Sequence, residues 1–462
     1  MMFLLSIDIG TSAVKAGVIS EAGALVSSGH VGLSFDTDAT GSEDIASRWL
    51  TAIEELLAGL PNVESVAGVV VSGNGPTLVP LAHDGSLSGP TLLWLDPGDG
   101  IEGEPSFFLP KIAAMRRLQP AAYERTRWFI SCPEYVSFVL TGIPITITPS
   151  AEFCASIWNR DSIRRYDIDP ETLPPFATVG DRVGKVQRAA STRFGIPVAT
   201  PVFAGGSDFL MSLLGTATIS PGRTCDRAGT SEGINHCSET NIESPSLRSL
   251  PHVVPGLYNV AGILASTGRI FEWFRRISGQ ERKPYEKMLR EIAEISSDRL
   301  PVFLPSLHRG DTWEFSAAAF MDLEPHHGVV DMGRSVVESI GYSIRDVIET
   351  LEANGCLVAE LRVSGGQARN SVWNQMKADM TGRRIIVPKV VDAELLGDAV
   401  AGFVGLGAFD ELGGASMQLY QTASEYEPAS ETTARYEDGY RLFCEKRERI
   451  LGNHRNSVSA NA

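Results

Sequence analysis

The tripeptide Gly-Thr-Ser occurs twice, at residues 10–12 and 229–231, and each copy lies between two strand-like runs. Residues 3–9 are apolar enough for a buried strand and residues 13–20 for a second one, so the first tripeptide closes a hairpin. Strands are expected at 222–230 and 233–239 around the second copy. Two halves that each open with the same hairpin indicate a duplicated architecture.

The chain has 462 residues, which is too long for one hydrophobic core, and two domains are expected. A helical pattern at 43–58 and a buried strand at 66–72 follow the first hairpins, which predicts a mixed α/β sheet covered on both faces. The boundary is placed near 218–222. The expected domains are 1–218 and 219–430, followed by a C-terminal helix and tail at 431–462.

Composition excludes several classes of partner. The formal net charge of −16 argues against nucleic acid and anionic membrane surfaces, which both need a positive footprint. An anionic small ligand must then be held locally by backbone N–H groups, a few cations and a metal. Six scattered cysteines, no credible signal peptide and no apolar run of membrane-spanning length favour a soluble protein in the reducing cytoplasm.

The first turn has the groups that phosphate oxygens need. Gly10, Thr11 and Ser12 offer backbone N–H groups and two hydroxyls, although such a tripeptide is also a good ordinary hairpin turn. Asp8 ends an otherwise apolar strand, where a carboxylate needs a cation, a metal or donors beside it. Lys15 lies on the paired strand and is either a phosphate contact or a solvated edge lysine.

Two further glycine-rich segments carry polar side chains. The run Ala204-Gly205-Gly206-Ser207-Asp208 precedes a helical stretch at 209–217, and Asp208 is either a chemical group or a helix N-cap. The loop 364–370 joins a strand to a helix. It is either an ordinary connection or a glycine surface for a flat adenine, with Gln367 or Asn370 at the edge of the base.

Four motifs together carry a resemblance. Asp8-x-Gly10-Thr11-Ser12, Gly-Gly-x-Asp at 205–208, Gly229-Thr230-Ser231 and Gly-Gly-Gln-Ala-x-Asn at 365–370 stand in the order and spacing of the FGGY family of carbohydrate kinases. The chain is most similar to xylulokinases, and the similarity runs from residue 4 to about 408.

The resemblance implies an α/β fold of two actin-like (ribonuclease H-like) domains with ATP and sugar meeting in a central cleft. It implies that Asp208 takes the proton of the acceptor hydroxyl, and that Asp8, together with Asp208, holds Mg²⁺. The remaining residues implied to bind the nucleotide are Gly10, Thr11, Ser12 and Lys15 at the γ-phosphate, Gly229, Thr230 and Ser231 at the β- and γ-phosphates, and Gly365, Gly366, Gln367 and Asn370 at the adenosine.

The sugar side departs from the family pattern. Xylulokinases have a histidine in the run that reads Ser72-Gly73-Asn74-Gly75-Pro76-Thr77 here, and an arginine after the Trp94-Leu95-Asp96 run. Asn74, Gly75, Trp94 and Asp96 are the candidate substrate residues, although a core tryptophan and a loop aspartate are equally good readings of the last two. Asp322 stands where the family usually has glycine, and Ala114 where it has tryptophan.

The expected reaction is phosphorylation of a small ketose or polyol by ATP, with D-xylulose as the first substrate to consider. Glycerol, a tetritol and a heptulose remain alternatives, and so does a catalytically silent actin-like nucleotide sensor. Retention of both Asp8 and Asp208 speaks against a sensor, and sugar-kinase segments within 303–338 speak against a filament-forming ATPase. A homodimer is left open.

Overall fold

The structure is a computed structural model of the chain and describes residues 2–33, 44–94, 96–229, 231–295, 299–307, 315 and 317–458. The chain forms two compact units. Unit 1 contains Met1–Ile219, Leu250–Tyr258 and Asp392–Gln421, and unit 2 contains Ser220–Ser249, Asn259–Val391 and Thr422–Ala462. The predicted domain boundary near residue 218 is not a test of where any binding site lies. The segment Asp392–Gln421 packs in unit 1, although the sequence analysis places it in the second domain.

Unit 1 is built on a six-stranded mixed sheet in the order β3-β2-β1-β4-β10-β9. Strands β1, β2 and β3 form an antiparallel meander, β1, β4 and β10 run parallel, and β9 is antiparallel to β10. The strands are β1 (Phe3–Ile9), β2 (Ala13–Ser20), β3 (Leu25–Gly32), β4 (Gly68–Gly73), β9 (Arg182–Lys185) and β10 (Pro201–Ser207). Both faces of β1 and β4 are buried, which is why these strands are continuous apolar runs.

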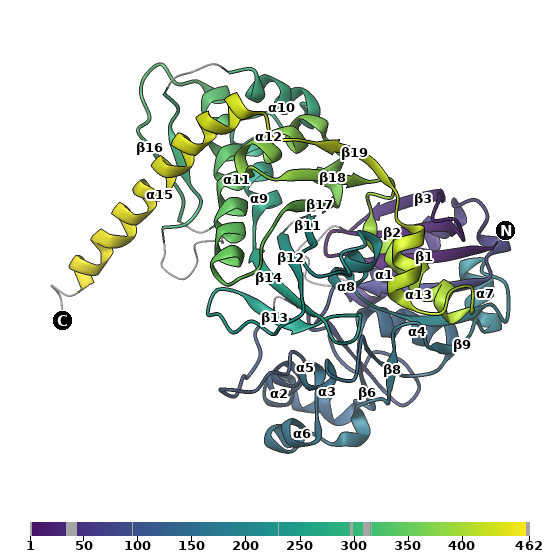
Figure 1. The fold of residues 1–462 in the computed structure, drawn as a ribbon. Coiled ribbons are helices and arrows are strands. Elements are labelled where there is room, and N and C mark those ends of the chain that lie inside the picture. The colour runs from purple at the N-terminus through teal and green to yellow at the C-terminus, as the bar shows by residue number, and fades with distance from the viewer. Residues whose placement is uncertain are drawn as a thin grey trace. The chain divides into compact units, whose positions relative to one another are not determined.

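Helices cover both faces of this sheet. Leu5 and Ile7 of β1 belong to the apolar cluster that includes α1 (Ile45–Ala58) and α4 (Cys132–Thr141). On the opposite face α13 (Ala393–Gly405) lies against β1, as Figure 1 shows for the yellow-green helix and the purple strands. A side chain at Gly397 of α13 would lie 1.9 Å from the carbonyl oxygen of Met211 in α8 (Asp208–Gly215), so only glycine permits this helix pair to pack so closely.

The remaining elements of unit 1 extend this core. They are β5 (Leu78–Leu81), α2 (Leu109–Leu118), α3 (Pro120–Arg125), β6 (Trp128–Ser131), β7 (Thr146–Thr148), α5 (Cys154–Ile157), α6 (Arg160–Tyr166), β8 (Phe176–Thr178), α7 (Arg188–Phe194) and α14 (Leu412–Leu419). Strands β5 and β6 pair with each other, and so do β7 and β8.

Unit 2 has a seven-stranded sheet in the order β13-β14-β12-β11-β17-β18-β19. Its strands are β11 (Thr224–Ala228), β12 (Glu232–Ser238), β13 (Arg248–Pro251), β14 (Tyr258–Leu264), β17 (Glu360–Ser364), β18 (Arg384–Pro388) and β19 (Thr422–Tyr426). Its helices are α9 (Thr267–Ile277), α10 (Tyr285–Ala293), α11 (Val329–Ala353), α12 (Ser371–Thr381) and α15 (Ser430–Val458), and a small sheet pairs β15 (Val302–Leu304) with β16 (Ala319–Met321).

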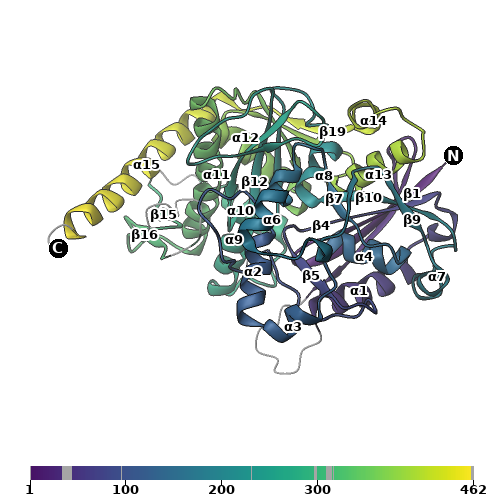
Figure 2. The ribbon, with the colours of Figure 1, turned by 90° about the horizontal axis from the view of Figure 1, so that it is seen from below.

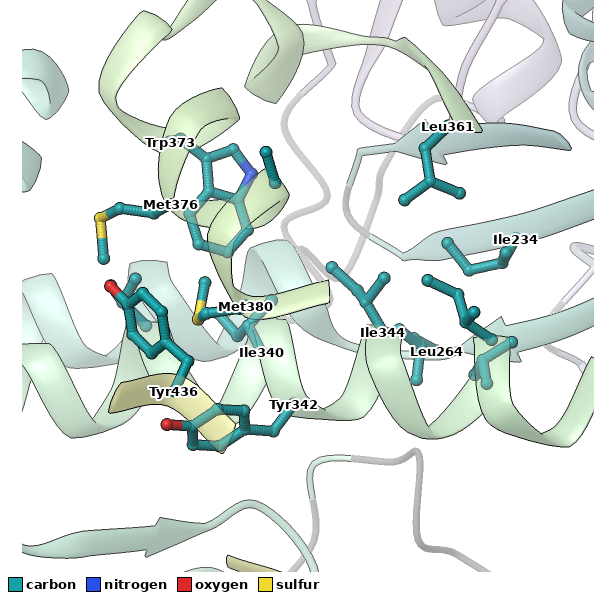
Figure 3. Close-up of a cluster of buried hydrophobic side chains, with 14 of the residues drawn as sticks. Ile234, Leu264, Ile340, Tyr342, Ile344, Leu361, Trp373, Met376, Met380 and Tyr436 are labelled. Atoms are coloured by element: carbon teal, nitrogen blue, oxygen red, sulfur yellow. The ribbon is translucent and has the colours of Figure 1, made fainter. Parts of the chain in front are cut away.

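The core of unit 2 forms where helices meet the sheet. Ile344 of α11 lies near Ile234 of β12, and Trp373 and Met380 of α12 belong to the same buried cluster (Figure 3). Helix α15 forms most of the predicted C-terminal helix and tail and continues to Val458. Its second half extends away from the rest of unit 2 in both Figure 1 and Figure 2. Among the residues that the structure describes, no helix is both long and apolar enough to cross a membrane.

The two units repeat one topology. The order β3-β2-β1-β4-β10 in unit 1 corresponds to β14-β12-β11-β17-β18 in unit 2, with the same antiparallel and parallel pairings around β1 and β11. Each Gly-Thr-Ser tripeptide connects the equivalent pair of strands, β1 to β2 and β11 to β12. The duplication indicated by the sequence is confirmed.

Candidate active site

Asp8 is buried at the end of β1, beside a serine of the neighbouring parallel strand. Its Cα partners are Lys15 on β2 and Ser72 on β4. The Ser72 hydroxyl oxygen lies 3.1 Å from Asp8 Oδ1 and 2.9 Å from Asp398 Oδ2. A hydroxyl has one proton to donate, so it connects two carboxyl groups that both remain short of donors.

Four carboxyl groups form what we call the unit 1 carboxylate cluster: Asp8, Asp208, Glu394 and Asp398. Burial, then the charges of Glu394 and Asp208, raise the pKa of Asp8 to about 7, although Lys15 opposes the shift. Burial and the charge of Asp8 raise the pKa of Asp398 well above its ordinary value. Glu394 Oε2 and Asp398 Oδ1 accept no hydrogen bond from any residue that the structure describes. The cluster therefore has an excess of negative charge.

Lys15 pairs with carboxylates of the segment before and within α13. Its Nζ lies 3.1 Å from Asp392 Oδ1 and 3.8 Å from Glu394 Oε2, with 26% of its side chain exposed. Burial alone would lower the pKa of Lys15, but Glu394, Asp8 and Asp392 together raise it. Lys15 is thus held by ion pairs close to the first turn, and a direct contact to phosphate stays a prediction.

Asp208 is the first residue of α8 and is half-buried. Ser207 occupies the N-cap position, and Asp208 Oδ1 accepts a hydrogen bond from the backbone N–H of Phe209 at 2.7 Å. Gly205, three residues before Asp208, is required by packing, because a Cβ there would lie 2.2 Å from the Val71 carbonyl oxygen. The close approach of β10 to β4 therefore sets where Asp208 emerges from the sheet.

The candidate sugar residues divide into two groups. Asn74 is buried and donates through Nδ2 to the carbonyl oxygen of Ile9, next to the first turn, and Gly75 follows it. Trp94 is half-buried, and its indole Nε1 donates to Thr11 Oγ1 at 3.1 Å, which places it against the first turn. Asp96 is exposed, and its carboxylate accepts a hydrogen bond from the Leu93 N–H of its own loop.

A buried lysine fixes the loop that carries Trp94. Lys111 of α2 donates from Nζ to the carbonyl oxygen of Leu93 at 2.6 Å and also to that of Asp96. Burial lowers the pKa of Lys111, with Asp96 acting in the opposite direction. The conformation of this loop thus depends on a charged side chain that lies 15 to 18 residues further along the chain.

In unit 2 a cavity of about 650 Å³ adjoins the second turn and the glycine loop. Four of the predicted nucleotide residues line it, Gly229, Gly366, Gln367 and Asn370. Ser231 is half-buried at the start of the strand that follows, and Thr230 lies outside the described residues. The cavity size is typical of sites for small molecules and cofactors.

The glycine loop has two different glycines. Gly365 has a φ of 86°, and a Cβ there would lie 2.1 Å from the Ala228 carbonyl oxygen, so glycine is needed for both conformation and space. Gly366 lines the cavity and has open space around it. Asn370 is the N-cap of α12, and its Oδ1 accepts the Trp373 N–H at 3.0 Å, so this side chain already has a structural role.

Asp322 belongs to neither group of predicted ligands. It has a φ of 55°, in the left-handed region that favours glycine, which gives a physical reason for the glycine that the family pattern expects there. Its carboxylate pairs with Lys446 of α15 at 2.6 Å. Asp322 is therefore a structural residue of unit 2.

Comparison with known proteins confirms the resemblance that the motifs carry. Residues 227–406 match the model of the C-terminal domain of the FGGY family of carbohydrate kinases. The chain is similar to these kinases over nearly its whole length. Similar curated proteins include the xylulose kinase of Lactococcus lactis subsp. lactis, 27% identical over 96% of both chains, and that of Bacillus subtilis, 24% identical over 96% of both chains.

Solved structures confirm the fold of this chain. The xylulose kinase from Rhodospirillum rubrum has a TM-score of 0.80 at 21% identity and covers 98% of this chain and 99% of its own. The gluconate kinase from Lactobacillus acidophilus has a TM-score of 0.82 at 21% identity, over 97% and 98%. The two-domain, actin-like α/β fold and the assignment as a carbohydrate kinase, both predicted from the motifs, are confirmed.

Sequence reasoning missed two members of the unit 1 carboxylate cluster, Glu394 and Asp398, and the role of Ser72, whose hydroxyl lies between Asp8 and Asp398. A signal for the two acids existed, because Glu394 and Asp398 are the only charged residues in the otherwise apolar run 393–405. Carboxylates one helical turn apart on an apolar helix share a buried face and need partners there.

Proposed function

We propose that this chain transfers the γ-phosphate of ATP to a hydroxyl of a small ketose or polyol, with D-xylulose as the first candidate. The observation that carries the proposal is the position of Asp208, which is half-buried at the start of α8 and belongs to the unit 1 carboxylate cluster. The xylulose kinases matched over 96% of both chains support the choice of substrate.

Asp208 acts as the general base in this proposal. The Phe209 N–H donates to Asp208 Oδ1 at 2.7 Å, and this bond orients the carboxylate without neutralising it. The carboxylate accepts the proton of the acceptor hydroxyl as the oxygen attacks the γ-phosphorus, and the bond to the β-phosphate oxygen breaks. General base catalysis of this kind contributes on the order of 10²–10⁴-fold to the rate.

A divalent cation fits the unit 1 cluster. Several carboxylates face one partly exposed lysine, and two buried carboxylate oxygens, on Glu394 and Asp398, have no hydrogen-bond donor among the described residues. Asp8 and Asp208 would hold Mg²⁺, which supplies charge neutralisation for the phosphates. Within the described ranges no three His, Cys, Asp or Glu side chains converge as a metal-binding group, consistent with an ion that keeps waters and phosphate oxygens as most of its ligands.

The nucleotide is proposed to occupy the cavity of unit 2. Gly366 leaves room for a flat base, Gln367 and Asn370 offer amide groups at its rim, and Gly229 begins the turn for the β- and γ-phosphates. Thr230 and Ser231 complete that turn in the proposal. Arg269 and Arg369 also line the cavity, together with Glu272 and Glu286, so its lining offers cationic groups to an anionic ligand alongside an equal number of carboxylates.

The first turn and the Trp94 loop are proposed to hold the sugar and the transferred phosphate. The indole of Trp94 donates to Thr11, so a sugar that contacts Trp94 and Asn74 would lie next to Gly10, Ser12 and the γ-phosphate. Asp96 is exposed and its carboxylate faces its own loop, which makes it the weakest of the proposed substrate residues.

The test is release of ADP over a panel of ketoses, polyols and sugar acids at saturating Mg²⁺ and ATP. We expect stimulation by D-xylulose above glycerol, a tetritol, a heptulose and gluconate. If no compound stimulates turnover while ATP still raises the melting temperature, the chain is a nucleotide sensor and the proposed function is wrong. A cytoplasmic location and a homodimer are part of the proposal and are checked by fractionation and by light scattering.

A further inference from the structure

A buried ion cluster lies between the second turn and the glycine loop of unit 2. Lys377 of α12 donates from Nζ to Glu232 Oε1 at 2.8 Å and also to Asp226 Oδ2. All three side chains are at most 1% exposed. We call these residues, Asp226, Glu232 and Lys377, the unit 2 lysine cluster.

The charges of this cluster balance only if it holds one proton. Two carboxylates and one ammonium group leave one negative charge, and a buried unpaired charge is costly. Lys377 Nζ bonds Asp226 Oδ2 and Glu232 Oε1, whereas Asp226 Oδ1 and Glu232 Oε2 accept no hydrogen bond from a donor in the described part of the chain. A hydrogen bond between the two carboxyl groups would satisfy both oxygens. Such a bond requires a proton on one of them.

The environment assigns that proton to Asp226. Burial, followed by the charge of Glu232, raises the pKa of Asp226 well above its ordinary value. Burial also disfavours ionised Glu232, but the charge of Lys377 and the hydrogen bonds from Asp226 and Lys377 lower its pKa. The cluster is then an ionised Glu232, an ionised Lys377 and a neutral Asp226, with no net charge.

The cluster joins the two segments that line the nucleotide cavity. Glu232 begins β12 directly after the second turn and is the Cα partner of Ala228, which lies on the other side of that turn and lines the cavity. Lys377 follows Trp373 by one helical turn in α12, and Trp373 also lines the cavity. Lys377 Nζ lies 5.4 Å from the centre of the Trp373 ring.

We propose that the unit 2 lysine cluster is a positioning device for the nucleotide site. It fixes the distance between the turn that follows β11 and the start of α12, and it carries one proton shared by Asp226 and Glu232. None of the three residues lines the cavity, so they act through Ala228, Gly229 and Trp373. The inference rests on the proposed function, because it takes the cavity to be the nucleotide site.

Steady-state kinetics separates positioning from mere stabilisation. Lys377→Met should raise the KM for ATP by about tenfold or more, the equivalent of about 1.4 kcal/mol, and leave the KM for the sugar unchanged. Asp226→Asn copies the neutral carboxyl group and is the matched control, with a KM for ATP close to that of the wild type. An unchanged KM for ATP in folded Lys377→Met overturns the proposal.

A triple variant covers the outcome in which Lys377→Met does not fold. Asp226→Asn, Glu232→Gln and Lys377→Met together remove every charge, so folding should recover while the ionic tie stays absent. A KM for ATP that remains raised supports positioning. A return of both melting temperature and KM to wild-type values shows that the cluster only stabilises unit 2, which overturns the proposal.

The shared proton has a direct test that needs no activity. Infrared spectra of the wild type should contain a band of a protonated carboxyl group that Asp226→Asn removes, and a spectrum without such a band overturns this part of the proposal. Failure of the proposed function gives a different result. In that case no sugar or polyol stimulates ADP release by the wild type, while the infrared band and the stability changes are still observed.

Discussion

Each unit buries carboxylates around one lysine, but the two lysines differ in how far they are exposed to solvent. In unit 2, Lys377 is buried and satisfies two carboxyl groups that share a proton. In unit 1, 26% of the Lys15 side chain is exposed, and its Nζ lies 3.1 Å from Asp392 and 3.8 Å from Glu394, so its ion pairs are longer and partly open to solvent. A closed cluster of this kind serves the fold, whereas an open one is completed by a ligand.

The duplicated topology makes this difference more specific. The residue two positions before the glycine of each turn is Asp8 in unit 1 and Arg227 in unit 2, and each is the Cα partner of a serine on the adjacent parallel strand, Ser72 and Ser364. One backbone arrangement therefore presents a carboxylate in one unit and a guanidinium in the other. The repeat fixes the backbone, and substitution of single residues decides which unit attracts a cation.

The largest expected effect is on kcat, and it comes from Asp208 in the unit 1 carboxylate cluster. Asp208→Asn should lower kcat by about 10²–10⁴-fold because the acceptor hydroxyl loses its base, while the affinity for ATP is retained. Coupled ADP release and nucleotide titration measure the two quantities. Asp161→Asn, an exposed carboxylate of α6, is the control and should behave as the wild type. A kcat within threefold of the wild type for Asp208→Asn would remove the catalytic assignment.

The two lysines should differ in their contribution to stability. Lys377→Met leaves two buried carboxyl groups without a cation and should lower the free energy of unfolding by about 3–5 kcal/mol. Lys15→Met should cost about 1 kcal/mol, since its pairs are partly solvated. Urea unfolding of both variants at neutral pH checks the comparison. Equal losses would show that the clusters do not differ as described.

The glycine loop offers a pair of matched substitutions. Gly365→Ala must strain a left-handed backbone and displace the Ala228 carbonyl, at a cost of about 3 kcal/mol, and it should also weaken ATP binding. Gly366→Ala adds a methyl group in open space and should change stability little. Thermal unfolding with and without ATP distinguishes them. Equal melting temperatures for the two variants would contradict this account of the loop.

Glu134 is a further buried carboxylate, and no lysine is among the groups that shift its pKa. Glu134 accepts hydrogen bonds from the N–H groups of Ser131 and Ile147, and burial raises its pKa from 4.5 to about 7. The folded chain then binds more protons than the unfolded chain between these pH values, so Glu134 lowers stability as the pH rises through this window, by about 3 kcal/mol in total.

Glu134→Gln has no such titration. Denaturant unfolding of the wild type and the variant should therefore give a stability difference that shifts in favour of the variant between about pH 5 and about pH 7.5. The lost hydrogen bond of the variant is a constant offset and does not affect the slope. A difference that is flat with pH would mean that Glu134 is ionised in the folded chain throughout.

The smallest effect is expected at the hydroxyl between Asp8 and Asp398. Ser72→Ala should lower the free energy of unfolding by about 1 kcal/mol, because one donor to two carboxyl groups is lost. The loss should shrink in saturating Mg²⁺, which supplies charge where the hydroxyl supplied a proton. Ser137→Ala, at another buried serine of unit 1, is the control, and a larger effect there would contradict the role of Ser72.

The sequence predicted the elements that depend on local pattern. The strands 3–9 and 13–20 have the bounds expected from apolar periodicity. Gly229, Gly366, Gln367 and Asn370 were predicted together and line one cavity, whereas Gly365 packs against Ala228. Lys377 and Glu232 could not be paired from sequence, because 145 residues separate them and nothing local indicates that α12 brings Lys377 to the start of β12.

What the sequence by itself determined is the repeated hairpin with its turn, the family resemblance and the identity of Asp208 as the candidate base, since these depend on residue type and short spacing. Tertiary structure alone decided how charge is distributed around the two lysines. Burial and the return of residues 392–421 to unit 1 bring Glu394 and Asp398 to Asp8, while α12 brings Lys377 to Asp226 and Glu232. Electrostatic energies depend on distance and solvent exposure, and neither quantity can be predicted from the order of residues alone.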